Sequence, residues 1–381
     1  MKHISTTLIF VTFIITGTEA FSQNLLIKDY KVPVSSAHSF LVDFNYNYAS
    51  DGKETTSNHG RIGTVYNTFY ESLTYGYSFD LIWAASRERR ANDYNADMDW
   101  RLRRYVWPHR NFFASVNPHS AHLKGYDRPT LDVTIGFGFG RFINATALAK
   151  AVRIEDFLLF SDQLHDDLPA ETMVSLGQII EKRDEYRTRY REAFKRYWYD
   201  DMAGIIKHSN MLKGEEIDAV GILRMDEVLF RENISDRFYG WDITLGAKLE
   251  LLTSESSEKR VAPAADITAR YSLPINWRAQ FNERFTANSQ VGGNFLKTYN
   301  IISASDFSYE VTNRIDFVMR HLLNVEKRSK DDDTQISNSL KLLFVFFVEN
   351  QINLTTSIEL EKYEKSKLEQ NYLMTLNYRV F

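Results

Sequence analysis

The chain has 381 residues, a formal net charge of −4, no cysteine and an aromatic content of 14%. A charge this close to zero gives no reason to expect nucleic acid as a partner, and without cysteine there can be no disulfide framework, thiolate metal site or lipidated N-terminal cysteine. The mean hydropathy of −0.37 is too low for a bundle of transmembrane helices, whereas the many tyrosine and phenylalanine residues fit β-strands.

The first residues have the pattern of a secretory signal peptide. Lys2 precedes an apolar run, Leu8–Ile15, and the small residues Ala20 and Ser22 follow it. The run is shorter than the roughly 20 residues that a helix needs to cross a bilayer, so we expect an export signal over residues 1–22. Cleavage is expected after Ser22, or else after Ala20, and the alternative is an uncleaved anchor helix.

The segment Thr130–Arg141 shows the pattern that dominates the rest of the chain. Large apolar side chains occupy every second position from Leu131 to Phe139, with polar residues or glycine between them. Because strand side chains point alternately to opposite faces, one face can contact hydrocarbon and the other water. Recurrence of this pattern predicts about 14 strands, and about 12 at the fewest. The predicted strands are Phe40–Tyr48, Arg61–Tyr70, Leu73–Ala85, Trp100–Trp107, Asn111–Val116, Pro129–Phe142, Phe238–Leu252, Ala262–Tyr271, Ile275–Phe285, Phe295–Val311, Arg314–Leu323, Gln335–Val348, Ile352–Leu360 and Asn371–Phe381.

The gaps between these segments alternate in length. Ser50–His59, Ser86–Asp99 and Asn117–Arg128 are long and polar, whereas Glu71–Ser72 and Pro108–Arg110 are short. The same alternation continues after residue 252, where Ser272–Pro274 is expected to be a short turn. Membrane barrels have short turns on one side and long loops on the other. We therefore expect an up-and-down antiparallel barrel with an even number of strands and both chain ends on the short-turn side.

The chain ends in an amphipathic segment, Leu376–Phe381. Here it resembles bacterial outer-membrane β-barrel proteins of the porin-like kind, whose last strand closes on a terminal phenylalanine. The resemblance implies the outer membrane of a Gram-negative cell, contact with its lipid and recognition by the barrel-assembly machinery. In one departure from the pattern, the apolar series Tyr372, Met374, Leu376 leaves Phe381 out of phase.

Between Asn144 and Ser235 the alternation stops and apolar residues recur at helical spacing. We expect helices over Thr146–Phe160, from Pro169 onward, over Glu181–Tyr199 and over Glu215–Phe230. This insert takes the place of a short turn, so we expect it in the periplasm; the alternative is a plug folded into the lumen. The predicted divisions are a signal peptide (1–22), a first barrel part of about six strands (23–143), the α-helical insert (144–235) and a second barrel part of about eight strands (236–381).

A basic and aromatic stretch, Arg183–Tyr199, lies within the insert. It is a candidate docking face for an acidic periplasmic protein or for peptidoglycan. The competing interpretation is a solvated helix stabilised by pairs four residues apart, such as Glu192–Arg196.

Charged residues on the predicted strands fall opposite the apolar faces. An arginine or lysine facing hydrocarbon at the bilayer midplane costs about 2–4 kcal/mol, so these side chains should point into the barrel. They either line a water-filled pore or pair across the lumen and close it; about 14 strands leave room for water, which favours the pore. The lumen-lining candidates are Arg101, Arg103, Asp132, Asp242, Glu250, Arg278, Arg284, Asp316, Arg320, Glu359 and Arg379.

No spacing in the chain is diagnostic of catalysis. His119, Ser120 and His122 cluster in a predicted external loop, where a hydrolase or a metal could use them, but nothing in the sequence fixes a carboxylate beside them. The glycines of Gly136–Gly140 are expected on the inner face of a strand and not in a phosphate loop. We therefore expect no enzyme activity and no cofactor.

Two functions remain open from the sequence. The first is a passive channel for small solutes through a polar lumen. The second is a non-transport anchor, whose helical insert binds a periplasmic or other envelope partner.

Overall fold

The computed structural model describes residues 34–50, 55–88, 91–107, 111–230, 232, 234, 236–255, 262–292, 295–312, 314–328, 333–349, 352–363 and 367–379. The predicted signal peptide and the terminal Phe381 lie outside these described residues, so both stay predictions.

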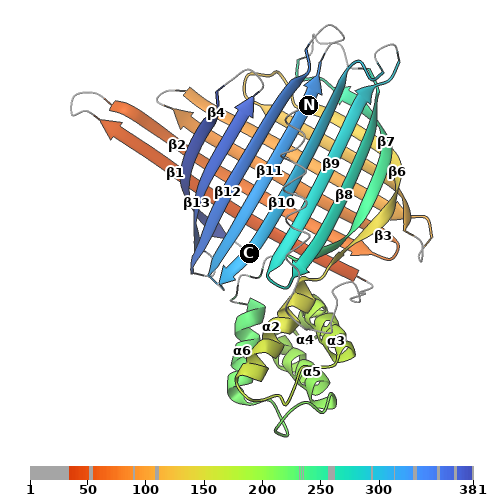
Figure 1. The fold of residues 1–381 in the computed structure, drawn as a ribbon, viewed down its shortest axis with the longest axis vertical. Coiled ribbons are helices and arrows are strands. Elements are labelled where there is room, and N and C mark those ends of the chain that lie inside the picture. The colour runs from red at the N-terminus through yellow and green to blue at the C-terminus, as the bar shows by residue number, and fades with distance from the viewer. Residues whose placement is uncertain are drawn as a thin grey trace.

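Fourteen antiparallel strands form one closed barrel in which each strand pairs with its neighbours in sequence and β1 pairs with β14 (Figure 1). This confirms the predicted barrel and the predicted helical interruption. The strands are β1 (Val34–Ser50), β2 (Thr55–Ser72), β3 (Tyr75–Glu88), β4 (Ala91–Tyr105), β5 (Phe112–Leu123), β6 (Thr130–Asn144), β7 (Phe238–Leu252), β8 (Ala264–Asn276), β9 (Ala279–Gln290), β10 (Tyr299–Thr312), β11 (Ile315–Lys327), β12 (Gln335–Glu349), β13 (Ile352–Tyr363) and β14 (Glu369–Arg379).

The barrel is apolar outside and polar inside, the reverse of a soluble protein. On β6, Ile135, Phe137 and Phe139 are 46–55% exposed, whereas the alternate positions Thr134 and Gly138 are buried. The exposed apolar residues continue around the other strands. An apolar outer surface on a closed β-barrel is stable only against hydrocarbon.

Several predicted strand boundaries are wrong. β1 and β2 begin six residues before the predicted starts, at Val34 and Thr55, and β9 and β10 begin four residues after them, at Ala279 and Tyr299. β4 begins at Ala91, so most of the predicted loop Ser86–Asp99 is strand, and β5 continues through the first half of the predicted loop Asn117–Arg128. Both stretches carry polar residues on their inner face, and because that composition is also typical of loops, the sequence predicted loops there. β8 runs through the predicted turn Ser272–Pro274, and the chain turns at residues 277–278 instead.

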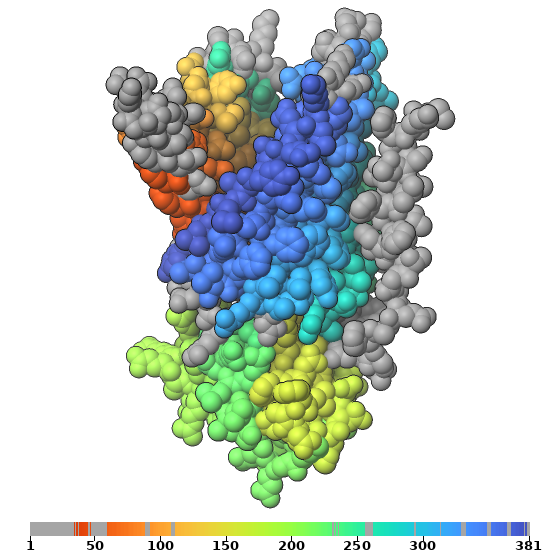
Figure 2. Space-filling view, turned by 60° about the vertical axis from the view of Figure 1, so that its left-hand side comes forward, coloured from red at the N-terminus to blue at the C-terminus, as the bar shows by residue number. Residues whose placement is uncertain are grey.

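The insert connects β6 to β7 and lies beyond one end of the barrel, which we call the basal end (Figures 1 and 2). Because the strands alternate in direction, β1 begins and β14 finishes at this same end. Within the described ranges, none of the helices is both long and apolar enough to cross a bilayer. The helical elements are α2 (Thr146–Phe160), α3 (Ala170–Glu181), α4 (Arg183–Tyr190), the 3₁₀ turn η2 (Arg191–Ala193), α5 (Phe194–His208) and α6 (Ala219–Phe230).

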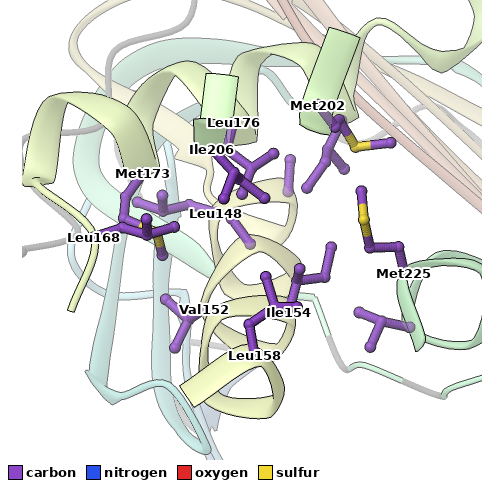
Figure 3. Close-up of a cluster of buried hydrophobic side chains, with 14 of the residues drawn as sticks. Leu148, Val152, Ile154, Leu158, Leu168, Met173, Leu176, Met202, Ile206 and Met225 are labelled. Carbon is purple, nitrogen blue, oxygen red and sulfur yellow. The ribbon is translucent and has the colours of Figure 1, made fainter. Parts of the chain in front are cut away.

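The insert has a hydrophobic core of its own. Leu148, Leu158, Leu176, Met202 and Met225 are fully buried and meet between α2, α3, α5 and α6 (Figure 3). The prediction of one helix over Glu181–Tyr199 is wrong, because α4 ends where Arg191 takes a φ of 50° and α5 then starts a new direction. The predicted start at Glu215 is also early, since α6 begins at Ala219.

One acidic side chain lies inside this core. The carboxylate of Glu155 in α2 is 2% exposed and accepts a 2.6 Å hydrogen bond from the backbone N–H of Leu168. Burial raises the pKa of Glu155 to about 7, because a buried carboxylate loses its hydration. The unfolded chain releases this proton near the ordinary value of 4.5, so between that pH and 7 the folded state binds more protons. Stability of the insert therefore falls as the pH rises through this window.

We predict that Glu155→Gln stabilises the insert at pH 8.5 by roughly 3 kcal/mol, the equivalent of the pKa shift, and changes little at pH 4. The amide keeps an oxygen for the Leu168 N–H and carries no charge. Hydrogen exchange of the amides of α2 and α3 in the full-length protein in detergent, corrected for intrinsic rates, measures the effect. Glu216→Gln, at an exposed carboxylate, is the control; equal protection in the two variants at pH 8.5 would contradict the prediction.

Candidate functional site

A group of buried charged residues, the basal cluster, fills part of the lumen near the basal end. It consists of Glu71, Arg103, Tyr105, Asp242 and Arg270. Arg103 Nη1 lies 3.0 Å from Asp242 Oδ2, and Arg270 Nε donates to Asp242 Oδ1 at 2.9 Å. Tyr105 donates its hydroxyl hydrogen to Glu71, whose other oxygen lies 3.9 Å from Arg103 Nη1. The contact between Arg103 on β4 and Asp242 on β7 passes over β5 and β6, so it runs through the interior.

Glycines on β6 make room for this contact. A Cβ at Gly138 would lie 2.4 Å from the carbonyl oxygen of Ile243 and 2.6 Å from the ring of Phe113. Gly140 has a φ of 123°, where a side chain would be strained. The Phe113 ring in turn packs against Tyr105, with 5.7 Å between the ring centroids, and lies 5.6 Å from the Arg103 guanidinium. The predicted inner face of Gly136–Gly140 is therefore the surface over which the basal cluster packs.

Most of the basal cluster is shielded from solvent, with Arg270, at 17%, its most exposed side chain. The side chains of Arg103, Asp242 and Glu71 are 3%, 1% and 4% exposed. Charges buried to this extent are stable only when they are paired, because each has lost its hydration. On this side of the barrel, charged residues therefore pair across the lumen and close it.

A second layer lies further from the basal end. Arg101 contacts Asp80 and Asp99 at 2.7 Å each, and Asn67 donates to Asp80 at 2.6 Å. Arg284 on β9 lies within electrostatic range of Arg101 and Asp99. Arg284 is exposed, so water reaches this layer.

The opposite wall of the barrel carries solvated pairs. Arg320 and Asp306 lie 3.1 Å apart with side chains 60% and 45% exposed. Lys341 and Glu359 lie 3.3 Å apart with side chains 29% and 28% exposed. Each pair joins neighbouring strands, so water reaches the lumen beside β10 to β13 at the level of these pairs. Nearer the basal end of the same strands, Glu310 and Asp316 are buried, and the β4 to β8 side is closed at the basal cluster.

The histidine and serine candidates lie on strand β5 and not in an external loop, which corrects the prediction. His119 faces the lumen, with its ring nitrogens 3.1 Å from Asp97 and 3.2 Å from Asp132. His122 lies on the outer face, 3.0 Å from the Tyr94 hydroxyl, and Ser120 donates to the carbonyl of Thr130. Because His119 and Ser120 point to opposite faces, they do not form a nucleophile and base pair. In the described part of the chain, no group of three or more potential ligands could hold a metal ion.

The other lumen candidates fall in different places. Asp132 contacts Lys248 at 3.3 Å, and the backbone of Glu250 pairs with that of Asp132. Arg278 lies in the turn between β8 and β9 and not on a strand. Asp316 is buried near the basal end. The side chain of Arg379 lies outside the described residues.

An ionic junction joins the insert to the barrel, and nothing in the sequence singled it out. Glu310 on β10 accepts hydrogen bonds from Arg153 of α2 and, at 2.5 Å, from Arg237, which precedes β7. Arg237 is fully buried and also donates to the carbonyl of Trp277 at 3.1 Å. The separation of Arg153 and Glu310 in sequence, 157 residues, explains why no local pattern could reveal this contact.

We predict that Asp242→Asn destabilises the barrel by about 3–5 kcal/mol, because it leaves Arg103 and Arg270 buried side by side without their shared anion. The matched control is Asp306→Asn, which breaks a solvated pair and should cost no more than about 1 kcal/mol. Urea unfolding of the reconstituted protein, followed by the gel mobility of the folded barrel, measures both. Equal losses in the two variants would show that Asp242 is solvated like Asp306, and would contradict the prediction.

Comparison with known proteins gives a likeness of architecture only. No protein-family model and no curated protein matches the chain. Among solved structures, the translocator domain of the autotransporter NalP from Neisseria meningitidis is 6% identical, with 99% of this chain and 96% of that chain covered and a TM-score of 0.28. OccAB3 from Acinetobacter baumannii is 8% identical, with 91% and 98% covered and a TM-score of 0.34. A BenF-like porin from Pseudomonas fluorescens is 7% identical, with 91% and 98% covered and a TM-score of 0.32.

Identities and TM-scores this low carry no argument about what the chain conducts or binds. The closed antiparallel barrel with an apolar exterior and a polar, charged interior is the architecture of outer-membrane β-barrels.

Proposed function

We propose that this protein is a passive outer-membrane channel for small hydrophilic solutes. The observation that carries the proposal is the difference in exposure between the two sides of the lumen. Arg320 and Asp306 are 60% and 45% exposed, whereas Arg103 and Asp242 are 3% and 1% exposed. Arg320, Asp306, Lys341 and Glu359 form one row across β10 to β13, the solvated strip, where water reaches the lumen. The proposal requires a path from this strip past Glu310 and Asp316, which are buried nearer the basal end.

The strip has mixed charge, which limits its selectivity. Arg320 and Lys341 each face a carboxylate on the neighbouring strand, so an ion in transit meets both signs. We expect weak preference between anions and cations, with size as the main restriction.

We further propose that the insert lies in the periplasm and that residues 1–22 direct export. The basal end has short connections: β2 ends at Ser72 and β3 begins at Tyr75, and β8 ends at Asn276 and β9 begins at Ala279. Short turns are typical of the periplasmic side.

The channel proposal predicts discrete conductance steps when the purified protein is incorporated into planar lipid bilayers. Arg320→Glu should shift the reversal potential in a salt gradient toward cation preference, because it places a second negative charge beside the water path. Arg196→Glu, at an arginine of the insert whose side chain is 81% exposed, is the control and should leave the potential unchanged. A bilayer that stays silent with folded protein would exclude the channel.

A second function, an anchor for an envelope partner, has one observation in its favour. Three large apolar residues of the insert lie outside its core: Phe160, Leu223 and Val220 are 88%, 69% and 56% exposed. The basic and aromatic stretch Arg183–Tyr199 is a weaker candidate surface, because Trp198 is buried in the core and Tyr199 donates to Asp226 at 2.6 Å.

If the anchor function is correct, a chain lacking residues 144–235 will still fold as a barrel and will lose a periplasmic protein or peptidoglycan fragment that co-purifies with the full chain. Leu223→Asp together with Val220→Asp should release the same partner without disturbing the insert. Retention of the partner by the deleted chain would contradict the anchor function.

A further inference from the structure

The seam that closes the barrel is much shorter than the other strand pairings. Among the described residues, which end at Arg379, β1 and β14 pair from Leu41 with Arg379 to Phe44 with Leu376. On its other side, β1 pairs with β2 over its whole length, from Val34 with Ser72 to Ser50 with Thr55. The seam therefore joins β1 and β14 near the base and leaves them unjoined beyond Phe44.

Both strands continue past the seam without each other. β1 stays paired with β2 as far as Ser50, and β14 is paired with β13 from Glu369 onward. The two strands therefore leave a wedge between them beyond Phe44, and Figure 1 shows strands β1 and β2 leaning away from the barrel at the end opposite the insert. Two free backbone edges thus face each other across an opening in the wall. Unpaired backbone groups in hydrocarbon cost several kcal/mol each, so water or a bound molecule must satisfy them.

The outer lips of the opening are aromatic and apolar. Phe44 and Tyr46 on β1 are 61% and 58% exposed, and Tyr372 and Met374 on β14 are 72% and 62% exposed. These four side chains lie on the lipid face, on either side of the wedge. They form a surface suited to a hydrocarbon chain.

A cavity of about 450 Å³ lies against β2 to β5, and its polar lining residues include His59, Arg61, Asp93 and Asn95. The backbone of Arg61 pairs with that of Asn45, so Arg61 is one strand spacing, about 4.8 Å, from the free edge. Its side chain is exposed, and within the described ranges no hydrogen bond or ion pair engages it. The cavity thus offers a cation and an imidazole on β2, next to β1, and a carboxylate two strands deeper, at Asp93 on β4.

We propose that the opening between β1 and β14 binds a zwitterionic amphiphile of the lysophospholipid class. Its phosphate is held by Arg61 and His59, its ammonium group by Asp93, and its acyl chain leaves the barrel between the aromatic lips. A hydrophilic solute crossing the lumen needs no opening toward lipid, and a molecule with one polar end and one apolar end needs both of these surfaces. Binding at the seam is independent of conduction, so the two proposals can fail separately.

Two cysteine pairs test the opening in a chain that has no natural cysteine. Phe44→Cys with Leu376→Cys joins the last paired residues of the seam, and oxidation should link them. Tyr46→Cys with Met374→Cys lies two residues further along the same face, and should stay reduced under the same conditions. Equal disulfide formation in both pairs would show a closed seam and overturn the proposal.

Photocrosslinking tests the ligand. A benzophenone attached at Leu373→Cys lies on the inner face of β14 beside the opening, and one at Leu322→Cys lies on the inner face of β11, away from it. In vesicles containing lysophosphatidylethanolamine, the label at position 373 should crosslink to the lipid and the label at 322 should not. Arg61→Gln should reduce the yield by roughly tenfold, because a charged hydrogen bond is lost.

A second substitution tests whether the ammonium group of the headgroup is recognised. Asp93→Asn should weaken crosslinking to lysophosphatidylethanolamine and leave crosslinking to myristate, which has no ammonium group, unchanged. Equal lipid crosslinking at positions 373 and 322, no effect of Arg61→Gln, or crosslinks to a second protein chain in place of lipid would each overturn the proposal. The last outcome would mean that a strand of another copy fills the opening.

Discussion

The structure depends on one constraint, the lack of water in hydrocarbon to satisfy backbone N–H and C=O groups. Strands that cross such a medium must pair on both sides, which forces closure into a barrel. Closure gives the barrel an outer face in hydrocarbon and an inner face in contact with water and polar groups. Apolar side chains are therefore exposed and charged ones buried, the reverse of a soluble protein. Phe137, an apolar residue, is 55% exposed, while the side chain of Asp242, a charged one, is 1% exposed. The same constraint explains why the unpaired backbone groups of the seam must bind water or another molecule.

The barrel could be predicted because its signal is local. A side-chain alternation with period two lies within each strand, and β7 and α2 begin and end where the sequence predicts. The errors arise where local composition conflicts with the fold. The inner face of β4 is so acidic that the strand resembles a loop from Asp93 to Asp99. The break at Arg191 depends on a single backbone conformation in a segment whose composition suits a continuous helix.

The charged interior was predictable only in part. Alternation places residues such as Arg103 and Asp242 on an inner face, but it does not say which of them meet. Their contact joins positions 139 apart in sequence and depends on the glycines of β6, one of the two strands between them. For the same reason, the sequence left open whether the charged residues line a water-filled pore or pair across the lumen and close it. Both outcomes occur: buried pairs close the lumen at the basal cluster, and the pairs of Arg320 with Asp306 and of Lys341 with Glu359 are solvated.

The insert and the seam meet at the base of β1. The backbone N–H of Ser36, near the start of β1, donates a 3.0 Å hydrogen bond to Glu181 at the end of α3. Burial raises the pKa of Glu181 to about 7, since this carboxylate is drawn between the helices and the barrel. β1 is therefore held at its base by the insert and further along by its pairing with β14 up to Phe44, beyond which the described residues of the two strands do not pair. Fixing one end of the strand in this way confines any opening of the wall to the half of the barrel away from the insert, where the aromatic lips and the Arg61 cavity lie.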